Sequence, residues 1–115
     1  MTIKELRDRY YFHDSCITRI DYKDKKLEMI LDFCQWAQEW YKKTDPENVW
    51  MRLIFSGIEQ YEGITGEIDY FSVLDAEIKE DKLWIFMLDD FHNENYEIFL
   101  KPTDVEVEIL GVVED

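Results

Sequence analysis

The fold is decided by residues 73–110, which read VLDAEIKEDKLWIFMLDDFHNENYEIFLKPTDVEVEIL. Apolar and charged residues alternate over 74–79, the pattern of a strand with one buried face. A turn at Asp81-Lys82 precedes the unbroken apolar run Leu83–Leu88, which predicts a strand covered on both faces. Alternation returns in two further segments, 96–100 and 105–109. We therefore predict an antiparallel meander of three or four strands with Leu83–Leu88 at its centre.

Upstream segments extend the β pattern and add one helix. Thr2 and Glu5 have the spacing of a capping box, which predicts a short opening helix that covers an end or an edge of the sheet. Two segments with strand patterns, Ile17–Tyr22 and Leu27–Phe33, form a predicted hairpin around Asp24-Lys25. The first third of the chain is thus expected to supply a helix and two paired strands.

A third upstream strand is predicted over Val49–Ile58, with Gly57 indicating a bulge or bend. Residues 34–44 fit helical and strand spacing equally well, so periodicity leaves both open. Residues 59–72 read as an acidic loop, with or without a short helical turn. We expect a mainly β fold, an antiparallel sandwich or partly open barrel of six to seven strands with a short N-terminal helix. All 115 residues belong to one domain in this interpretation.

The charge is distributed very unevenly along the chain. Residues 1–55 hold ten Lys or Arg and ten Asp or Glu, whereas residues 56–115 hold three and seventeen, which accounts for the whole net charge of −14. Such a field repels nucleic acid and anionic membranes and attracts cationic molecules. We therefore expect a basic protein partner, and no binding to nucleic acid or membrane. The competing interpretation is an acidic surface that only maintains solubility.

The candidate partner-binding residues follow from the predicted meander. On an antiparallel sheet the polar positions of adjacent strands lie side by side, so one acidic face is expected. Its predicted members are Asp75, Glu77, Glu97, Glu106 and Glu108. A second candidate group consists of Trp36, Trp40 and Trp50. Core packing is the ordinary role of such aromatic residues, but if exposed they would form an interface patch.

Two histidines carry the only hint of site chemistry. His13 stands in the sequence His13-Asp14-Ser15, but adjacent residues in an extended segment point to opposite faces and do not form a triad. A metal site would have to combine a larger set of residues, His13, Asp14, Asp89, Asp90 and His92. The competing interpretation has Asp14 and Ser15 bonding local backbone N–H groups, with His13 half-buried beside them. We expect no catalytic residue, no metal and no cofactor.

Cys16 and Cys34 are expected to be buried, reduced thiols of a cytosolic protein, because two cysteines without close spacing make no disulfide framework. The first residues show no signal-peptide pattern. The longest apolar run has six residues, which is too short to span a membrane. We therefore expect a cytoplasmic protein.

A family resemblance adds a functional expectation. Phe12-His13-Asp14-Ser15-Cys16-Ile17, the hairpin after it and Leu53-Ile54-Phe55-Ser56-Gly57-Ile58 resemble a group of small bacterial cytosolic proteins. In that group an aromatic–His–Asp–Ser opening leads into a β-hairpin, and some members look like immunity proteins that neutralise secreted polymorphic toxins. The resemblance covers about residues 11–60 and implies a β-rich fold. It also implies that residues 34–44 extend a strand and carry a long hairpin loop, and it brings no catalytic residues.

The sequence thus predicts a non-enzymatic, acidic protein-binding module, of the immunity type, that neutralises a basic, nuclease-type toxin. Two alternatives stay open. The first is a small enzyme or a ligand- or metal-binding protein that uses His13, Asp14 and Asp89–His92. The second is a structural or regulatory module whose acidic surface has no partner. The oligomeric state is open in all three.

Overall fold

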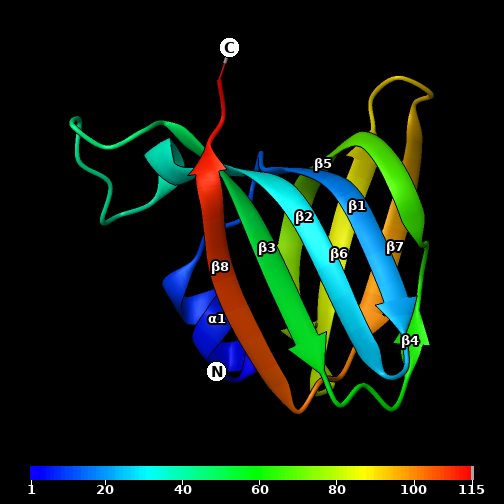
Figure 1. The fold of residues 1–115 in the computed structure, drawn as a ribbon. Coiled ribbons are helices and arrows are strands. Elements are labelled where there is room, and N and C mark those ends of the chain that lie inside the picture. The colour runs from blue at the N-terminus through cyan, green and yellow to red at the C-terminus, as the bar shows by residue number, and fades with distance from the viewer. Residues whose placement is uncertain (115) are drawn as a thin grey trace.

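Eight strands form one antiparallel sheet in the computed structural model, which describes residues 1–114 (Figure 1). Their order across the sheet is β4-β7-β6-β5-β1-β2-β3-β8, and the sheet is not closed, because β4 and β8 remain at its two edges. The elements are α1 (Ile3–Arg9), β1 (Cys16–Lys23), β2 (Lys26–Cys34), the 3₁₀ turn η1 (Gln35–Ala37), β3 (Asn48–Ser56), β4 (Tyr61–Glu62), β5 (Gly66–Lys79), β6 (Lys82–Asp89), β7 (Glu94–Leu100) and β8 (Asp104–Val112).

The long strand β5 folds this sheet into two layers. Its first half pairs with β1 and its second half pairs with β6, with a register shift between Val73 and Asp75. Bulges bend the strand that contains them. As a result β8, β3, β2 and β1 lie in front of β6 and β7, and the two layers enclose the core (Figure 1). The predicted mainly antiparallel β fold is confirmed. It is one open sheet folded into two layers, which we call the sandwich.

The predicted count of six to seven strands is too low, because the segment read as an acidic loop contains β4 and the start of β5. Its apolar residues are out of phase: Ile68 and Phe71 are both buried although they are three positions apart. Between them Tyr70 has a φ of +53°, and β5 carries extra residues opposite β1 here. The bulge therefore hides the strand from a search for strict alternation.

The tight turns explain two of the hairpins. Asp24 and Lys25 have φ values of +52° and +62°, as a type I′ turn requires, and they join β1 to β2 as predicted. Glu80 and Asp81 have φ values of +50° and +65° and join β5 to β6 in the same way. The second turn thus lies one residue earlier than the predicted Asp81-Lys82.

The meander is confirmed for β5, β6 and β7, with β6 at its centre, but β8 does not continue it. After β7 the chain crosses between the layers, and β8 pairs with β3, placing Val107 opposite Leu53. The Thr103 N–H donates to the Ser56 carbonyl oxygen at this crossing. A Cβ at Gly57, where φ is +67°, would lie 2.1 Å from Thr103 Oγ1, so the predicted bend at Gly57 is where the crossing segment packs.

The helix closes one side of the sandwich beside β8 (Figure 1). The predicted capping box is present: Thr2 Oγ1 accepts the Glu5 N–H, and Glu5 Oε1 accepts the Thr2 N–H. Leu6 is fully buried in the core. The Met1 ammonium donates to the Val105 carbonyl oxygen, and the Val105 N–H donates to the Met1 carbonyl oxygen, both at 2.8 Å. The predicted covering of a sheet edge by the N-terminal segment is therefore confirmed. No helix within residues 1–114 is long and apolar enough to cross a membrane.

Residues 34–44 do not extend a strand. β2 ends at Cys34, and the η1 turn and an irregular loop lead to β3, so the expected strand extension is wrong and the expected long hairpin loop is right. The buried side chain of Gln38 explains the ending. Its Oε1 accepts the Tyr11 N–H at 2.8 Å, and its Nε2 donates to the carbonyl oxygens of Tyr11 and Cys34 at 2.7 and 2.9 Å. These bonds tie the loop to the segment between α1 and β1.

Candidate partner-binding surfaces

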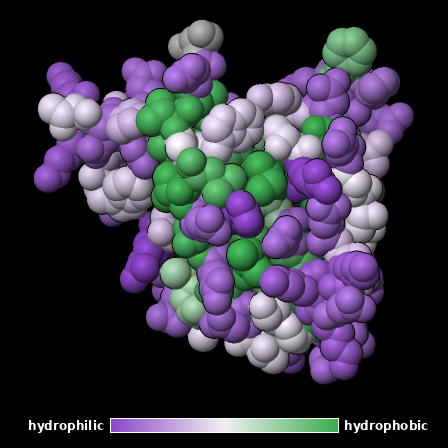
Figure 2. Space-filling view, viewed as in Figure 1, coloured by the Kyte–Doolittle hydropathy of each residue, from purple (hydrophilic) through white to green (hydrophobic). Residues whose placement is uncertain are grey.

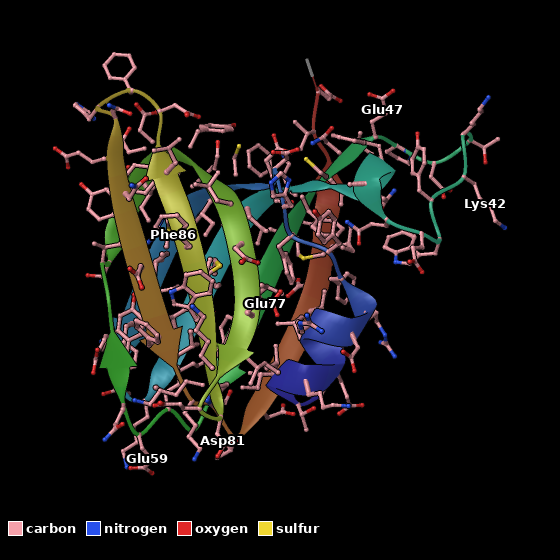
Figure 3. All side chains as sticks on the ribbon, turned by 180° about the vertical axis from the view of Figure 1, so that it is seen from behind. Lys42, Glu47, Glu59, Glu77, Asp81 and Phe86 are labelled. Carbon is pink, nitrogen blue, oxygen red and sulfur yellow. The ribbon has the colours of Figure 1, made fainter. Side chains whose placement is uncertain are left out.

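Three of the predicted acidic residues lie together on the outer face of the rear layer. The strand register forms two rows across this face, Asp75–Phe86–Glu97 and Glu77–Trp84–Phe99. We call these six residues the rear surface. Figure 3 shows the layer from behind, with Glu77 and Phe86 labelled on neighbouring strands. Carboxylates thus alternate with aromatic rings on a face that faces away from the core.

The aromatic residues of the rear surface are held in place by polar and stacking contacts. Trp84 and Phe86 stack with ring centroids 5.8 Å apart and an interplanar angle of 8°. The Trp84 Nε1–H donates to Glu97 Oε2 at 2.8 Å, and the Lys79 ammonium lies 3.5 Å from the centre of the Trp84 ring. Glu77 accepts from Arg7 of α1 at 2.7 Å. The Trp84 ring is therefore held by neighbours from the same chain, and its N–H bonds a carboxylate.

The outer face of β6 was predicted to be covered, and this prediction is wrong. Leu83, Ile85 and Met87 point into the core, whereas the alternate residues Trp84, Phe86 and Leu88 are only partly buried. No element of residues 1–114 lies over them. The unbroken apolar run therefore marks a strand with one core face and one apolar, partly exposed face.

Negative charge is concentrated around the rear surface. Residues 57–100 hold two Lys and twelve Asp or Glu. Within the described part of the chain only Glu59, Glu77 and Asp89 of these twelve make a salt bridge, and the partner of Asp89 is a histidine. The other carboxylates have no cation within salt-bridge distance there. This half of the sandwich therefore carries a large uncompensated negative field.

The remaining two acidic candidates lie elsewhere, so the predicted single acidic face is wrong. Glu106 and Glu108 are on β8, in the front layer, opposite Ile54 and Arg52 of β3. The Glu108 carboxylate and Arg52 Nη1 are 3.9 Å apart. The prediction failed because β8 was placed next to β7, whereas β7 is second from one edge of the sheet and β8 forms the opposite edge. Five carboxylates are thus divided between the outer faces of two layers.

The front layer carries its own apolar patch. Apolar residues gather over β8 and its neighbours, interrupted by hydrophilic side chains (Figure 2). Near this end of β8, Leu110 is 43% exposed, and Ile109 and Val112, which lie opposite the buried Met51 and Val49, are 52% and 55% exposed. Trp50 lies on the outer face of β3 and packs edge-on against Tyr70 at 6.4 Å. The edge strand β8 is therefore apolar at its C-terminal end and acidic in its middle.

Trp36 and Trp40 are on the loop between β2 and β3 and are not core residues. They are 48% and 45% exposed, which contradicts core packing as their role. Trp40 packs edge-on against Tyr10 at 6.4 Å, and its Nε1–H donates to the Arg9 carbonyl oxygen. Exposure is the condition under which these tryptophans were expected to form an interface patch. Trp50 is not part of this group, since its ring pairs with Tyr70.

The His13 region is a structural corner. Asp14 has a φ of +70°, its N–H donates to the Val73 carbonyl oxygen, and its carboxylate lies 3.2 Å from His13 Nδ1. It makes no side-chain bond to a backbone N–H in residues 1–114, so that prediction is wrong for Asp14. Ser15 is fully buried and its Oγ accepts the Cys34 N–H at 2.9 Å. The Ser15 bond is to backbone as predicted, but it reaches across to β2 rather than to a local group.

His92 belongs to a separate turn at the end of β6. The buried Asp89 accepts the N–H groups of Phe91 and His92 with Oδ1 and pairs with His92 Nδ1 through Oδ2 at 2.8 Å. Burial alone would raise the pKa of Asp89, but the His92 side-chain and backbone hydrogen bonds lower it below its ordinary value. The same side-chain hydrogen bond raises the pKa of His92. Asp90 is bonded to Ser72 at 3.0 Å.

The five residues proposed for a metal therefore fall into local contacts with different partners. In the described range 1–114 no three His, Cys, Asp or Glu side chains are grouped so as to hold a metal ion. Cys34 is buried and Cys16 is only partly so, and both thiols are free and directed at the Asp14 carbonyl oxygen. Burial raises the pKa of both thiols, which disfavours the reactive thiolate.

Several residues of these surfaces were absent from the candidates named from sequence: Trp84, Phe86, Phe99, Ile109 and Val112. The sequence did contain a signal for Trp84 and Phe86. They lie in an apolar run of the predicted meander, and no predicted helix was available to cover its second face. Comparison of the chain with protein-family models, curated proteins and solved structures finds no match.

Proposed function

We propose that this chain is a protein-binding module that recognises a partner with a basic surface through the rear surface. The observation that carries the proposal is the uncovered Trp84–Phe86 pair between Asp75, Glu77 and Glu97. Partly exposed aromatic residues are typical anchors of protein interfaces, and carboxylates beside them select Lys and Arg. The Lys79 ammonium above the Trp84 ring is an intramolecular example of the contact expected from a partner.

The electrostatic field supports the same partner. Association with a basic protein relieves the repulsion among the carboxylates of residues 57–100 and steers the encounter. In keeping with the family resemblance, the proposed partner is a basic, nuclease-type toxin that the chain neutralises as an immunity protein. A nucleic-acid-binding surface is basic, so an acidic module that covers it excludes the toxin's substrate.

The test is capture of the partner from native-cell lysate by the full chain and two variants. One variant removes the rear carboxylates with Asp75→Asn, Glu77→Gln and Glu97→Gln. The matched control removes three exposed carboxylates outside the rear surface with Glu62→Gln, Glu67→Gln and Asp69→Asn. We expect wild type and control to retain a basic protein that the rear variant loses.

The kinetics of the captured pair provide the second readout. Raising ionic strength is expected to slow association far more than it accelerates dissociation, because charges act mainly on the encounter. A captured protein that binds the rear variant and the control equally well, with an association rate insensitive to salt, would contradict the proposal.

A further inference from the structure

Within residues 1–114, the outer edge of β8 presents backbone groups that have no strand partner. Met1 exchanges two hydrogen bonds with Val105, so the backbone of Val105 faces away from β3. The N–H and C=O groups of successive residues point to opposite sides of an antiparallel strand, so those of Val107 and Ile109 point to the same open side as those of Val105. After the register shift opposite Trp50 and Met51, the Val113 N–H donates to Asn48 of β3, which turns the backbone of Val112 outward again. Beyond Met1, the edge therefore offers N–H and C=O groups of Val107, Ile109 and Val112.

An apolar pocket lies directly beside this open edge. It is lined by Arg9, Tyr10, Phe33, Gln35, Trp40, Met51 and Ile109. Ile109 is opposite Met51 in the ladder, and the Met51 side chain is buried in the core. A strand added to β8 would continue this row, and its inward side chain beside Ile109 would enter the pocket. Its walls are aromatic on the α1 and loop sides, where Tyr10 packs against both Phe33 and Trp40.

The two faces of β8 select different side chains on such a strand. Arg9 on the pocket wall disfavours a basic side chain at the inward position, whereas aromatic walls favour an apolar one. On the outer face the exposed carboxylates of Glu106 and Glu108 have Arg52 as their one salt-bridge partner within residues 1–114. A strand beside them would place Lys or Arg in this row. A second copy of the chain is disfavoured, since two molecules of net charge −14 repel.

From this geometry we infer that the β8 edge and the adjoining pocket bind an extended segment of a protein partner by strand addition, with apolar side chains inward and basic side chains outward. Strand addition combines backbone hydrogen bonds for affinity with alternate side-chain pockets for specificity. The basic character of the segment rests in part on the proposed function. The site itself is distinct from the rear surface, because β8 and β6 belong to different layers.

The probe is a synthetic peptide, acetyl-(Lys-Val)₃-amide, titrated into the ¹⁵N-labelled full chain and followed by NMR. A peptide with Glu in place of Lys is the charge control. We expect the Lys-Val peptide to shift the amide signals along 107–112 and to slow hydrogen exchange at Ile109 and Val112. The Glu-Val peptide is expected to bind at least tenfold more weakly.

Two variants separate strand addition from general charge attraction. Ile109→Lys places a charge in the inward row at a side chain that is already half exposed, so the fold should stand, and binding should fall at least tenfold. Val112→Pro removes the outward N–H without removing a bond to β3 and should also weaken binding, whereas Val112→Ala should not. The rear variant, with Asp75→Asn, Glu77→Gln and Glu97→Gln, should still bind the peptide at β8.

The outcomes are distinguishable from those of the proposed function. Shifts confined to Trp84 and its neighbours, or equal binding of both peptides, would overturn the edge site while leaving the rear surface as the binding site. Retained binding in both Ile109→Lys and Val112→Pro would overturn it as well. A dimer of the chain joined through β8, seen by sedimentation and intermolecular NMR contacts, would identify the occupant as a second copy and contradict the inference.

Discussion

The indole N–H of Trp84 donates to the carboxylate of Glu97 at 2.8 Å across the β6–β7 pair. This bond fixes an aromatic ring that would otherwise be free to rotate on an uncovered face. It also sets a carboxylate at the ring edge, while Lys79 lies over the ring face. The rear surface is therefore ordered before any partner arrives, which lowers the entropic cost of binding.

The separate roles of the charge and the aromatic ring on the rear surface can be tested with Glu97→Gln and Trp84→Phe. The Glu97→Gln variant keeps an acceptor for the indole but removes the charge, so the partner's association rate should fall while its dissociation rate changes little. Trp84→Phe removes the indole N–H and shortens the anchor, so dissociation should accelerate. Stopped-flow association and dissociation measurements on both variants check this division. Equal effects of the two substitutions on the same rate constant would contradict it.

Gln38 is predicted to be a major contributor to stability. Its amide satisfies three backbone groups of Tyr11 and Cys34, and all three lose their partner in Gln38→Ala. An unpaired buried group costs about 1–3 kcal/mol at most, and the two groups of Tyr11 are only partly buried, so we expect a loss of roughly 2–4 kcal/mol in the free energy of unfolding. Gln35→Ala removes one bond to the Pro46 carbonyl oxygen and is the matched control, with an expected loss of about 1 kcal/mol or less. Urea unfolding measures both.

Substitutions of Asp14 test whether its backbone conformation or its side chain matters for stability. Because its φ is +70°, glycine at this position removes the left-handed penalty, whereas alanine retains it and loses the tolerance of aspartate for this region. We expect Asp14→Gly to be neutral or stabilising and Asp14→Ala to cost about 1 kcal/mol. Urea unfolding of the two variants decides, and a larger loss for glycine than for alanine would indicate a side-chain role.

The Asp89–His92 pair predicts a pH-dependent contribution to stability. The pKa of His92 is raised, so its contribution is complete below the ordinary value of 6.5 and is lost as pH rises through the folded value. The pKa of Asp89 is lowered, so its contribution is present above 3.8 and is lost as pH falls through the folded value. The melting temperature difference between wild type and His92→Ala should therefore be larger at about pH 5.5 than at about pH 8.5. In an Asp89→Asn background the His92→Ala effect should lose this pH dependence.

Residue faces and the strand neighbours joined by tight turns could be read from the sequence, but the neighbour of β8 could not. The alternation of Val105 and Val107 identifies an inward row correctly, yet it is the same pattern that Tyr96 and Ile98 show on β7. A connection of only three residues between these strands resembles a hairpin, while the chain in fact crosses between layers over Gly57. Pairing is decided by tertiary contacts, which the period of a single strand does not encode.

The exposed aromatic residues were the other difficulty. Burial is the usual source of stability of hydrophobic residues, so Trp84 was predicted to be covered. For Trp36 and Trp40, core packing stood as the ordinary role beside an exposed interface patch. In the fold, the hydrogen bonds of Gln38 hold the Trp36–Trp40 loop outside the sandwich, and the uncovered rear layer leaves Trp84 partly exposed. The candidate carboxylates were identified individually, and their division between layers depended on the position of β8.

The double pairing of β5 has a consequence for how the protein opens. A single continuous strand supplies ladder partners to β1 on one side and to β6 on the other, so neither layer detaches without breaking it. Segments that unfold locally are usually separable hairpins, whereas here β5 belongs to both layers and joins them. Amide protons of β1 and of β6 should then exchange through one common unfolding event, at equal free energy. Meanwhile β8, whose pairing with β3 closes the longest loop of any strand pair, is expected to re-form last.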